Sequence, residues 1–444
     1  MVKKIRSIVT VTLCTAMCVC ACSSQDSAAK PKEPAASETE EVRKEVKEEK
    51  EYQKKLDMIQ PSAYDNVMGL KLEKGTNLSV IGKADGVPYW EEVKKGAEQA
   101  VEDINKNLGY EGKDRVKVTY SAPGIPDDVD EQVNILDEEL ARYPAALGIA
   151  IADVNACEVQ FDLAAESDIP VVAFDSGSAY QGLMAMVSTD NQASAKEAAG
   201  RLAELTDDSG EIILFIHDSK SESAMNRENA FKEEIEENHP EIRVAETYYL
   251  DQLSEMQKKV AAEKNGGTYG EDADTESDKG AETEGTEPVG AEDTGDDNAG
   301  DAGDQTGDSI AQDQDTLTAE EEAEAESITE EEIIDYLLAK HPDVKGIYAT
   351  NGDAVKLAVN ALERNKTDAA IVGYDADEEE LDALADGKVD ALVLQNPFGM
   401  GYATIIAAAR AALSMGNEAV VDTGYTWLTK ENIEDKAIQA LLYH

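Results

Sequence analysis

Short apolar runs and amphipathic stretches alternate along the chain from about residue 76 onward. Runs such as ALGIAIA (146–152) and PVVAF (170–174) lack polar alternation, which is typical of strands buried on both faces. The segments between them, such as 91–108 and 191–206, repeat apolar residues at helical spacing. The predicted strands cover 77–82, 115–121, 146–152, 170–175, 211–217, 243–249, 344–350, 369–375 and 390–395.

Strands that alternate with helices predict an α/β fold, with parallel sheets covered by helices on both faces. Without the terminal and acidic segments described below, roughly 300 residues remain. That length is enough for two α/β domains, each with a core of its own.

The N-terminus has the pattern of a secretory signal. A basic start, MVKKIR, precedes an apolar run at 7–19 that is too short to span a membrane as a helix. Cys22 follows the small residue Ala21, which resembles the lipobox of bacterial lipoproteins. This resemblance implies a signal peptide at 1–21 and a lipid on Cys22; an ordinary Cys-rich signal peptide is the alternative.

Two polar segments are expected to lie outside the folded part. Residues 22–75 are predicted to be a polar tether, rich at first in Ser, Ala, Pro, Glu and Lys. Residues 265–327 carry 22 Asp and Glu against one Lys, so we predict a disordered acidic insertion that splits one helix into halves at 254–264 and 329–341. Its Gly-Asp spacing also resembles calcium-binding repeats, but a solvated, charge-repelled loop is the simpler interpretation.

The formal net charge of −54, with scattered Lys and Arg, argues against nucleic-acid binding. Cys14, Cys18 and Cys20 would leave with the signal, so only Cys157 would stay as a free thiol. The four histidines are far apart and have no metal-ligand spacing. We therefore expect neither a disulfide, a metal nor a cofactor.

Polar and aromatic side chains follow the predicted strands at their carboxyl ends, where open α/β sheets bind ligands. Flat rings cover the C–H faces of sugars, while carboxylates, amides and guanidinium groups bind hydroxyls. No activated nucleophile or nearby base accompanies them, so the pattern indicates binding rather than catalysis, with no catalytic residue. These side chains are Tyr89, Trp90, Asp175, Asn191, Arg227, Asn351, Asp375 and Gln395.

The sequence resembles the type I periplasmic binding proteins, in particular the sugar-binding lipoproteins of ABC importers related to ribose- and galactose-binding proteins. The resemblance covers about residues 76–444 except the insertion. Its matching stretches include VPYWEEVKKGAEQA, DIPVVAFDSG, VSTDNQASAKEAAGRLAE, NRENAFKEEI, HPDVKGIYATN, IVGYDADEEELDALADGKVDALVLQNPFGMGY and DTGYTWLTKENI.

The resemblance implies two Rossmann-like lobes with parallel sheets, joined by a three-segment hinge and closing on a ligand. The N-terminal lobe would comprise 76–189 and 396–424, and the C-terminal lobe 190–395 and 425–444. The crossovers would lie near Thr189-Asp190, Asn396-Pro397 and Gly424-Tyr425.

Carried over position by position, the family's ligand contacts fall on the eight residues named above. Asp375 and Arg227 would bond ring or anomeric hydroxyls, and Tyr89 and Trp90 would sandwich the sugar ring. The chain departs from the ribose-binding pattern at Ser176, at Ala150 and at Val87, so ribose itself is in doubt. From the residues alone, packing, helix capping, hinge or ion-pair roles stay open for these positions.

The resemblance implies an extracytoplasmic, lipid-anchored monomer that carries a monosaccharide to ABC permease subunits. A receptor for a signalling or chemotaxis ligand, such as a furanosyl autoinducer, or for a nucleoside would use the same fold. A repressor would need an N-terminal DNA-binding motif, and a glycosidase would need an acid–base pair of carboxylates.

Overall fold

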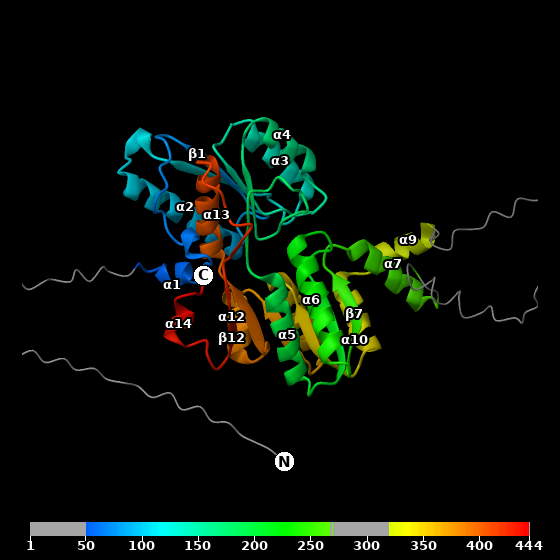
Figure 1. The fold of residues 1–444 in the computed structure, drawn as a ribbon. Coiled ribbons are helices and arrows are strands. Elements are labelled where there is room, and N and C mark those ends of the chain that lie inside the picture. Colours follow the sequence, from blue (N-terminus) through cyan, green and yellow to red (C-terminus); the bar gives the residue numbers. More distant parts are fainter. Residues whose placement is uncertain (1–49, 267–268, 270–318, 444) are drawn as a thin grey trace, which may run out of the picture. The chain divides into compact units, whose positions relative to one another are not determined.

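A computed structural model describes residues 50–266, 269 and 319–443 of the chain. The described part holds two six-stranded sheets, in the order β11-β5-β4-β3-β1-β2 and β12-β10-β9-β8-β6-β7 (Figure 1). Both sheets are mostly parallel and carry helices on their faces, as the α/β prediction required. The predicted signal peptide and Cys22 lie outside the described residues.

The strands of the first sheet are β1 (Asn77–Ile81), β2 (Lys117–Ser121), β3 (Leu147–Ile149), β4 (Val171–Phe174), β5 (Met186–Ser188) and β11 (Val420–Asp422). Those of the second are β6 (Gly210–Ile216), β7 (Ile242–Tyr249), β8 (Val344–Ala349), β9 (Ala370–Tyr374), β10 (Ala391–Gln395) and β12 (Tyr425–Thr429).

The α-helices are α1 (Gln53–Asp57), α2 (Pro88–Leu108), α3 (Val129–Leu140), α4 (Glu158–Glu166), α5 (Asn191–Leu205), α6 (Glu222–Asn238), α7 (Leu253–Lys264), α9 (Ala319–Glu326), α10 (Glu330–Lys340), α11 (Gly352–Asn365), α12 (Glu378–Asp386), α13 (Pro397–Ala412) and α14 (Lys436–Gln439). Short 3-10 helices cover Ser62–Tyr64 and Gly112–Asp114. Within these described ranges, no helix has both the length and the apolar character needed to cross a bilayer.

One strand departs from the expected parallel arrangement. β12 runs antiparallel to β10, with Gln395 opposite Tyr425, because the chain enters it directly from β11 through a two-residue connection. The short strands β5, β11 and β12 were absent from the strand prediction. Each has only three to five residues, too few to show a clear pattern.

The chain passes between the two sheets at three places, after β5, after β10 and after β11. Residues 189–190, 396 and 423–424 occupy these passages. Asn396 Nδ2 donates to the Thr423 carbonyl oxygen at 2.9 Å, so two of the passages are in direct contact. The division into two lobes that move as units stays a prediction.

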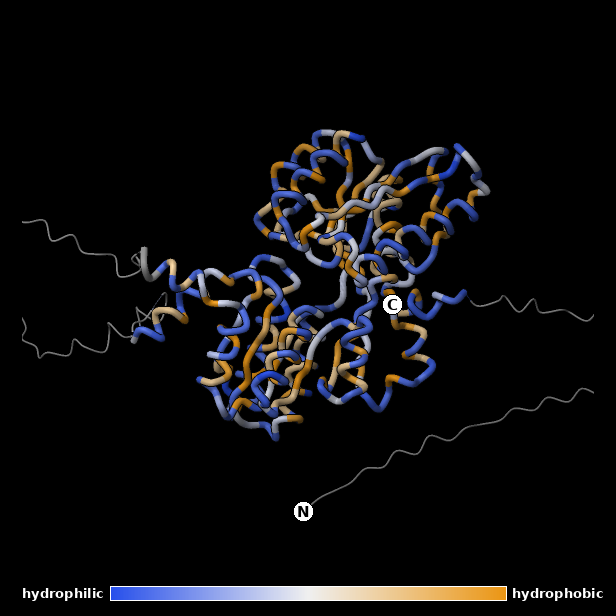
Figure 2. Tube along the Cα trace, turned by 180° about the vertical axis from the view of Figure 1, so that it is seen from behind, coloured by the Kyte–Doolittle hydropathy of each residue, from blue (hydrophilic) through white to orange (hydrophobic). Residues whose placement is uncertain are grey.

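Each sheet is buried on both faces by helices. In the first sheet, α2 and α13 cover one face and α3 and α4 the other. In the second, α5 and α6 cover one face, while α7, α10, α11 and α12 lie on the other. The hydrophobic stretches of the tube gather where strands and helices meet (Figure 2).

Two glycines allow α2 and α13 to pack closely. A Cβ on Gly96 would lie 2.0 Å from the Phe398 carbonyl oxygen, and one on Gly401 would lie 1.9 Å from the Val93 carbonyl oxygen. Either Cβ would meet rigid helix backbone, so the close crossing requires glycine at both positions. This crossing fixes the helix that starts with Tyr89 and Trp90 against the first sheet.

The predicted tether at 22–75 is wrong for its described part, residues 50–75. Leu56, Ile59, Tyr64, Leu70 and Leu72 are at most 3% exposed and belong to the core of the first sheet. The burial of these five side chains stabilises the fold. The tether prediction was wrong because the many Glu and Lys residues around them are typical of a solvent-exposed segment.

The predicted disorder at 265–327 is wrong for its last residues, because 319–326 form α9. Ala325 and Ile328 are buried against Met256 and Val260 of α7. α7 and α10 lie beside one another, linked by the hydrogen bond from Tyr336 to Glu263 at 2.9 Å, so they are not two halves of one helix. Most of the remaining insertion lies outside the described residues.

Candidate ligand-binding cleft

The strands of both sheets deliver side chains to one cavity. It contains about 720 Å³ of space free of atoms, part of which opens to solvent. The sequence-predicted residues that line it are Tyr89, Trp90, Asp175, Arg227, Asn351, Asp375 and Gln395. The structure therefore brings together seven of the eight candidates, while their role as ligand contacts stays a prediction.

Asp175 and Asp375 occupy equivalent places in the two sheets. Each follows a central strand, β4 or β9, and donates its backbone N–H to the neighbouring strand, at Val187 O (2.9 Å) or Val393 O (3.0 Å). Each has a positive φ, 59° for Asp175 and 74° for Asp375. A left-handed backbone is costly for a residue with a Cβ and is concentrated at functional sites.

Arg227 is 3% exposed and is held on every side. Its Nε donates to Asn191 Oδ1 at 2.8 Å, its Nη1 to the Thr350 carbonyl at 2.6 Å, and its Nη2 to Gln395 Oε1 at 2.8 Å. The guanidinium also lies 4.1 Å from the Tyr374 ring centroid. These contacts fix its direction, and two of its five N–H donors are left for a ligand.

Asn191 does not line the cavity. It is 7% exposed and lies behind Arg227, and its Oδ1 accepts the hydrogen bond that Arg227 Nε–H donates. Asn191 therefore positions the guanidinium. Its place after a strand fitted this role and ligand contact equally well, so the sequence pattern could not tell the two apart.

The other amides act on both backbone and site. Asn351 is the N-cap of α11, with its Oδ1 accepting Ala354 N–H at 2.9 Å, and it also lines the cavity. Gln395 donates to Asp375 Oδ1 at 2.7 Å, and Asp375 Oδ2 accepts Gly352 N–H at 3.1 Å. Asp375 is thus not the cap of α12, which is Asp377.

The predicted sandwich of a sugar ring between Tyr89 and Trp90 is wrong. Their rings meet edge to face at 81°, with centroids 5.1 Å apart, so no ligand ring fits between them. Trp90 is 8% exposed and packs edge-on against Phe174 in the core. The Tyr89 hydroxyl instead donates to Asp175 Oδ1 at 2.9 Å, so Tyr89 contributes a polar group as well as a ring.

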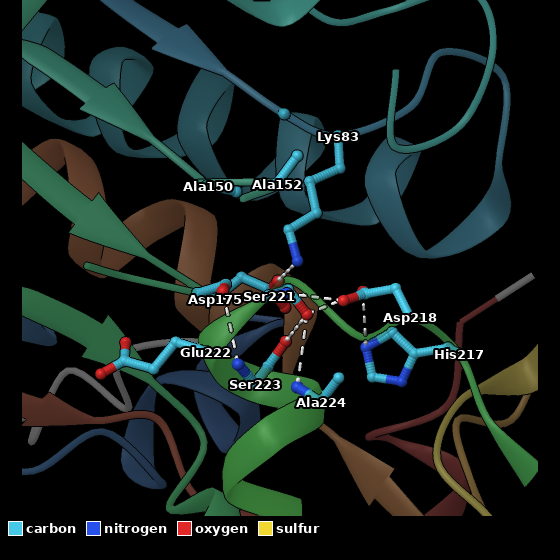
Figure 3. A network of polar contacts seen from close by, with 12 residues as sticks. Lys83, Ala150, Ala152, Asp175, His217, Asp218, Ser221, Glu222, Ser223 and Ala224 are labelled. Carbon is cyan, nitrogen blue, oxygen red and sulfur yellow. Dashed lines mark hydrogen bonds and ion pairs between the residues drawn. The ribbon is translucent and has the colours of Figure 1, made fainter. Parts of the chain in front are cut away.

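Sequence reasoning missed several lining residues, of which Lys83 is the clearest. Lys83 is 3% exposed, and its Nζ lies 3.3 Å from Asp175 Oδ2 (Figure 3). It supplies a cation beside Asp175, close to Ser176, one of the three positions at which the chain departs from the ribose-binding pattern. Its position just after β1 was the available signal. Tyr443, one residue from the C-terminus, had no such signal.

His217, which lines the cavity, forms a polar group with Asp218 and Ser221 (Figure 3). The Ser221 hydroxyl donates to Asp218 Oδ2 at 2.7 Å, and His217 Nδ1 lies 2.7 Å from Thr350 Oγ1. The Ser221 hydroxyl is thus hydrogen-bonded to the Asp218 carboxylate and not to the His217 imidazole. The same carboxylate accepts the Ser221 backbone N–H just before α6. This arrangement holds the start of α6 and does not activate a nucleophile.

Burial lowers the pKa of His217 to about 4. Its pKa in an unfolded chain is about 6.5, so below that pH the unfolded state binds a proton that the folded state does not. The folded wild type therefore loses stability as the pH falls. Between pH 7.5 and pH 5, we expect the free energy of unfolding of His217→Gln to rise by roughly 1–2 kcal/mol relative to that of the wild type. Urea denaturation at both pH values measures this difference. His239→Gln, at a ring outside the cavity, is the control, and an equal gain there would contradict the assignment.

Three hydrogen bonds join loops of the first sheet directly to the start of α6. Glu222 accepts Gly177 N–H at 2.8 Å, Ser223 N–H donates to Ser176 Oγ at 3.3 Å, and Val154 N–H donates to the Lys220 carbonyl at 3.1 Å.

Within residues 50–266 and 319–443, no cluster of three or more His, Cys, Asp or Glu side chains is placed to hold a metal ion.

The sequence matches the family described as periplasmic binding protein domain over residues 78–265 and 289–418, well over half of the chain. The chain belongs to the periplasmic binding protein family. The match spans strands of both sheets, and the described fold has the two parallel α/β sheets expected for a type I periplasmic binding protein.

Curated relatives of this periplasmic binding protein match over shorter stretches. The ribose import binding protein of Escherichia coli (strain K12) is 30% identical over 94 residues, 21% of this chain and 32% of the relative. That of Bacillus subtilis (strain 168) is 29% identical over 65 residues, 15% of this chain and 21% of the relative. The chain thus matches only a third or less of the length of each.

Solved structures share the fold over most of the chain. A carbohydrate transporter solute-binding protein from Agrobacterium radiobacter, in complex with D-arabinose, has a TM-score of 0.59 and 23% identity and covers 84% of this chain and 99% of its own. A glucose-galactose binding protein from Geobacillus stearothermophilus has a TM-score of 0.58 and 19% identity, with 81% and 99% covered. At these identities the likeness concerns the fold.

Proposed function

We propose that this protein is an extracytoplasmic solute-binding lipoprotein of an ABC importer and that it binds a monosaccharide in the cleft between its two lobes. The observation that carries the proposal is the pair of aspartates, Asp175 and Asp375, which both lie on left-handed backbone at strand ends and line one cavity with Arg227. Ribose-binding relatives and structures bound to D-arabinose support a sugar as the ligand.

Each aspartate has a cationic or amide partner that fixes its carboxylate. Lys83 lies beside Asp175, and Gln395 links Asp375 to Arg227. Carboxylates accept hydrogen bonds from sugar hydroxyls, while Lys83 and the free N–H groups of Arg227 donate to them. Tyr89 lines the same cavity and could offer its ring as an apolar surface for C–H groups. This set recognises a polyol without attacking it, so we propose that the protein is not an enzyme.

Ligand contacts from both lobes would favour the closed arrangement over an open one. The closed, monomeric protein would then deliver its cargo to permease subunits in the membrane. The lipid on Cys22 would hold it at the outer face of the cell membrane. The test of this anchoring is a Cys22→Ser variant, which should leave the membrane fraction.

The cargo can be found by thermal denaturation of residues 23–444 with single pentoses, hexoses, polyols, nucleosides and amino acids. A ligand that binds only the folded state at about 1,000 times its Kd adds about 4 kcal/mol, so we expect one or a few sugars to raise Tm by several degrees. The rise should be absent in Asp375→Ala. A shift with nucleosides or furanone-type signals alone would contradict the sugar assignment while keeping the fold.

A further inference from the structure

Glu380 places an unsatisfied carboxyl oxygen at the inner end of the cleft. The side chain lines the cavity and is 1% exposed. Its Oε2 accepts Asp377 N–H at 2.8 Å and completes the capping box at the start of α12. Its Oε1 is buried and has no hydrogen-bond partner within the described ranges. The capping role explains one oxygen of this carboxyl and leaves the other unexplained.

The neighbouring elements pack closely around Oε1 without donating a hydrogen bond to it. A Cβ on Gly352, the first residue of α11, would lie 2.1 Å from this oxygen. Lys356 Nζ is 3.9 Å away and is instead bonded to Asp377 Oδ2 at 2.7 Å. Glycine at this position therefore lets the start of α11 lie close against Oε1, and the nearby Lys356 is already bonded to Asp377.

The charges inside the cleft do not balance. Six carboxyls and three bases line the cleft. Two of the carboxyls, Asp127 and Asp353, are exposed; the buried or half-buried ones are Asp175, Asp375, Asp377 and Glu380, and the bases are Lys83, Arg227 and Lys356. The first three of these buried or half-buried carboxyls each lie next to a cation, or reach one through Gln395. Glu380 is the fourth, and the missing positive charge has to come from elsewhere if it is to ionise.

We propose that the sugar bound in this cleft carries a primary ammonium group and that Glu380 Oε1 receives it. This inference rests on the proposed function, since it names the class of sugar that the same cleft takes: an amino sugar. The ammonium donates to Oε1, which satisfies the buried oxygen and places a positive charge beside the one buried carboxyl that has no bonded cation of its own. A neutral hexose or pentose offers a hydroxyl there but no charge.

The proton balance of this step follows from the groups that face Glu380. Burial, with Asp375 and Asp377, raises the pKa of Glu380 to about 9, against the smaller opposing effects of the Asp377 N–H and Lys356. Tyr443, which also lines the cavity, faces the same carboxyls. The carboxyl is thus protonated near pH 7 before binding. When the ammonium docks, the O–H bond of Glu380 breaks and its proton goes to the buffer.

The first test compares matched pairs of sugars, glucosamine with glucose and galactosamine with galactose, by isothermal titration calorimetry at pH 6.5 on residues 23–444. A charge-assisted contact predicts that at least one amino sugar binds about 10-fold or more tightly than its parent. Glu380→Gln keeps a capping-box side chain but cannot ionise, so this ratio should fall to about one. Glu379→Gln, at the exposed neighbouring position, is the matched control and should keep the ratio.

A second readout needs no variant and does not depend on how well Glu380→Gln folds. Titrations of the wild type in two buffers with different ionisation enthalpies count the protons released on binding. We expect close to one proton released per amino sugar bound and close to none per parent sugar. Equal proton release for both sugars, or an amino-sugar preference that survives in Glu380→Gln, would overturn the inference.

The outcomes separate this inference from the function on which it rests. Neutral sugars that bind as tightly as their amino counterparts, or more tightly, would overturn the ammonium assignment and leave sugar binding intact. If neither class of sugar binds, while a nucleoside or another solute raises Tm, the proposed sugar function fails, and this inference fails with it.

Discussion

Arg227→Met should weaken ligand binding by about 100-fold or more. The substitution keeps much of the side-chain length but removes the cation that holds Gln395 and, through it, Asp375. It also leaves buried carboxylates without their compensating charge, and breaking such a group typically costs several kcal/mol. Calorimetric titration with whichever solute raises Tm measures the loss.

Arg201→Met is the matched control for this prediction. Arg201 lies on the outer side of α5 in ion pairs with Glu197 and Glu204, and its side chain is 46% exposed. Such surface pairs contribute about 0–1 kcal/mol, so binding should stay within about 2-fold of the wild type. If Arg227→Met weakened binding no more than Arg201→Met does, Arg227 would not contribute to ligand binding. Urea denaturation of both variants would then show whether Arg227 contributes to stability instead.

Leu56→Ala and Ile59→Ala should each lower the free energy of unfolding by about 2–5 kcal/mol. Both side chains are at most 1% exposed, and they pack in the first-sheet core although they belong to a segment rich in Glu and Lys. Loss of a buried aliphatic side chain removes its transfer free energy and leaves a cavity. Urea denaturation of residues 23–444 measures the change.

Met68→Ala serves as the control in the same segment, because Met68 is 80% exposed. Its free energy of unfolding should stay within about 0.5 kcal/mol of the wild type. If Leu56→Ala and Ile59→Ala were as mild as this control, residues 50–60 would not contribute to the core as described.

The sequence predicted those parts of the fold in which local pattern and tertiary burial agree. Central strands such as β4 and β9 are continuously apolar because they are covered on both faces, and a strand-end rule then located Asp175 and Asp375. β12 was missed because its five residues lie at a sheet edge and are too few to show a clear pattern. Leu56 and Ile59 were missed because two apolar residues among charges carry almost no periodic signal.

The missed parts of the site have physical reasons of their own. Lys83 stands in a Gly- and Asp-containing loop, where a lysine is ordinarily solvated, and only the tertiary structure buries it against Asp175. Glu380 follows two other glutamates in the first turn of α12. Acidic residues are common there because the helix dipole stabilises them, so the sequence did not mark Glu380 as a site residue. The orientation of Tyr89 and Trp90 could not be predicted, because adjacency in sequence does not fix the angle between rings.

The three hydrogen bonds between the first-sheet loops and the start of α6 bear on how cargo leaves the protein. They involve Gly177, Ser176 and Val154 and would persist if the cavity were empty. At about 0.5–1.5 kcal/mol each, they offset part of the cost of bringing the loops together, whether or not a ligand is present. Separation of these loops would therefore cost free energy even after a ligand has left the cavity.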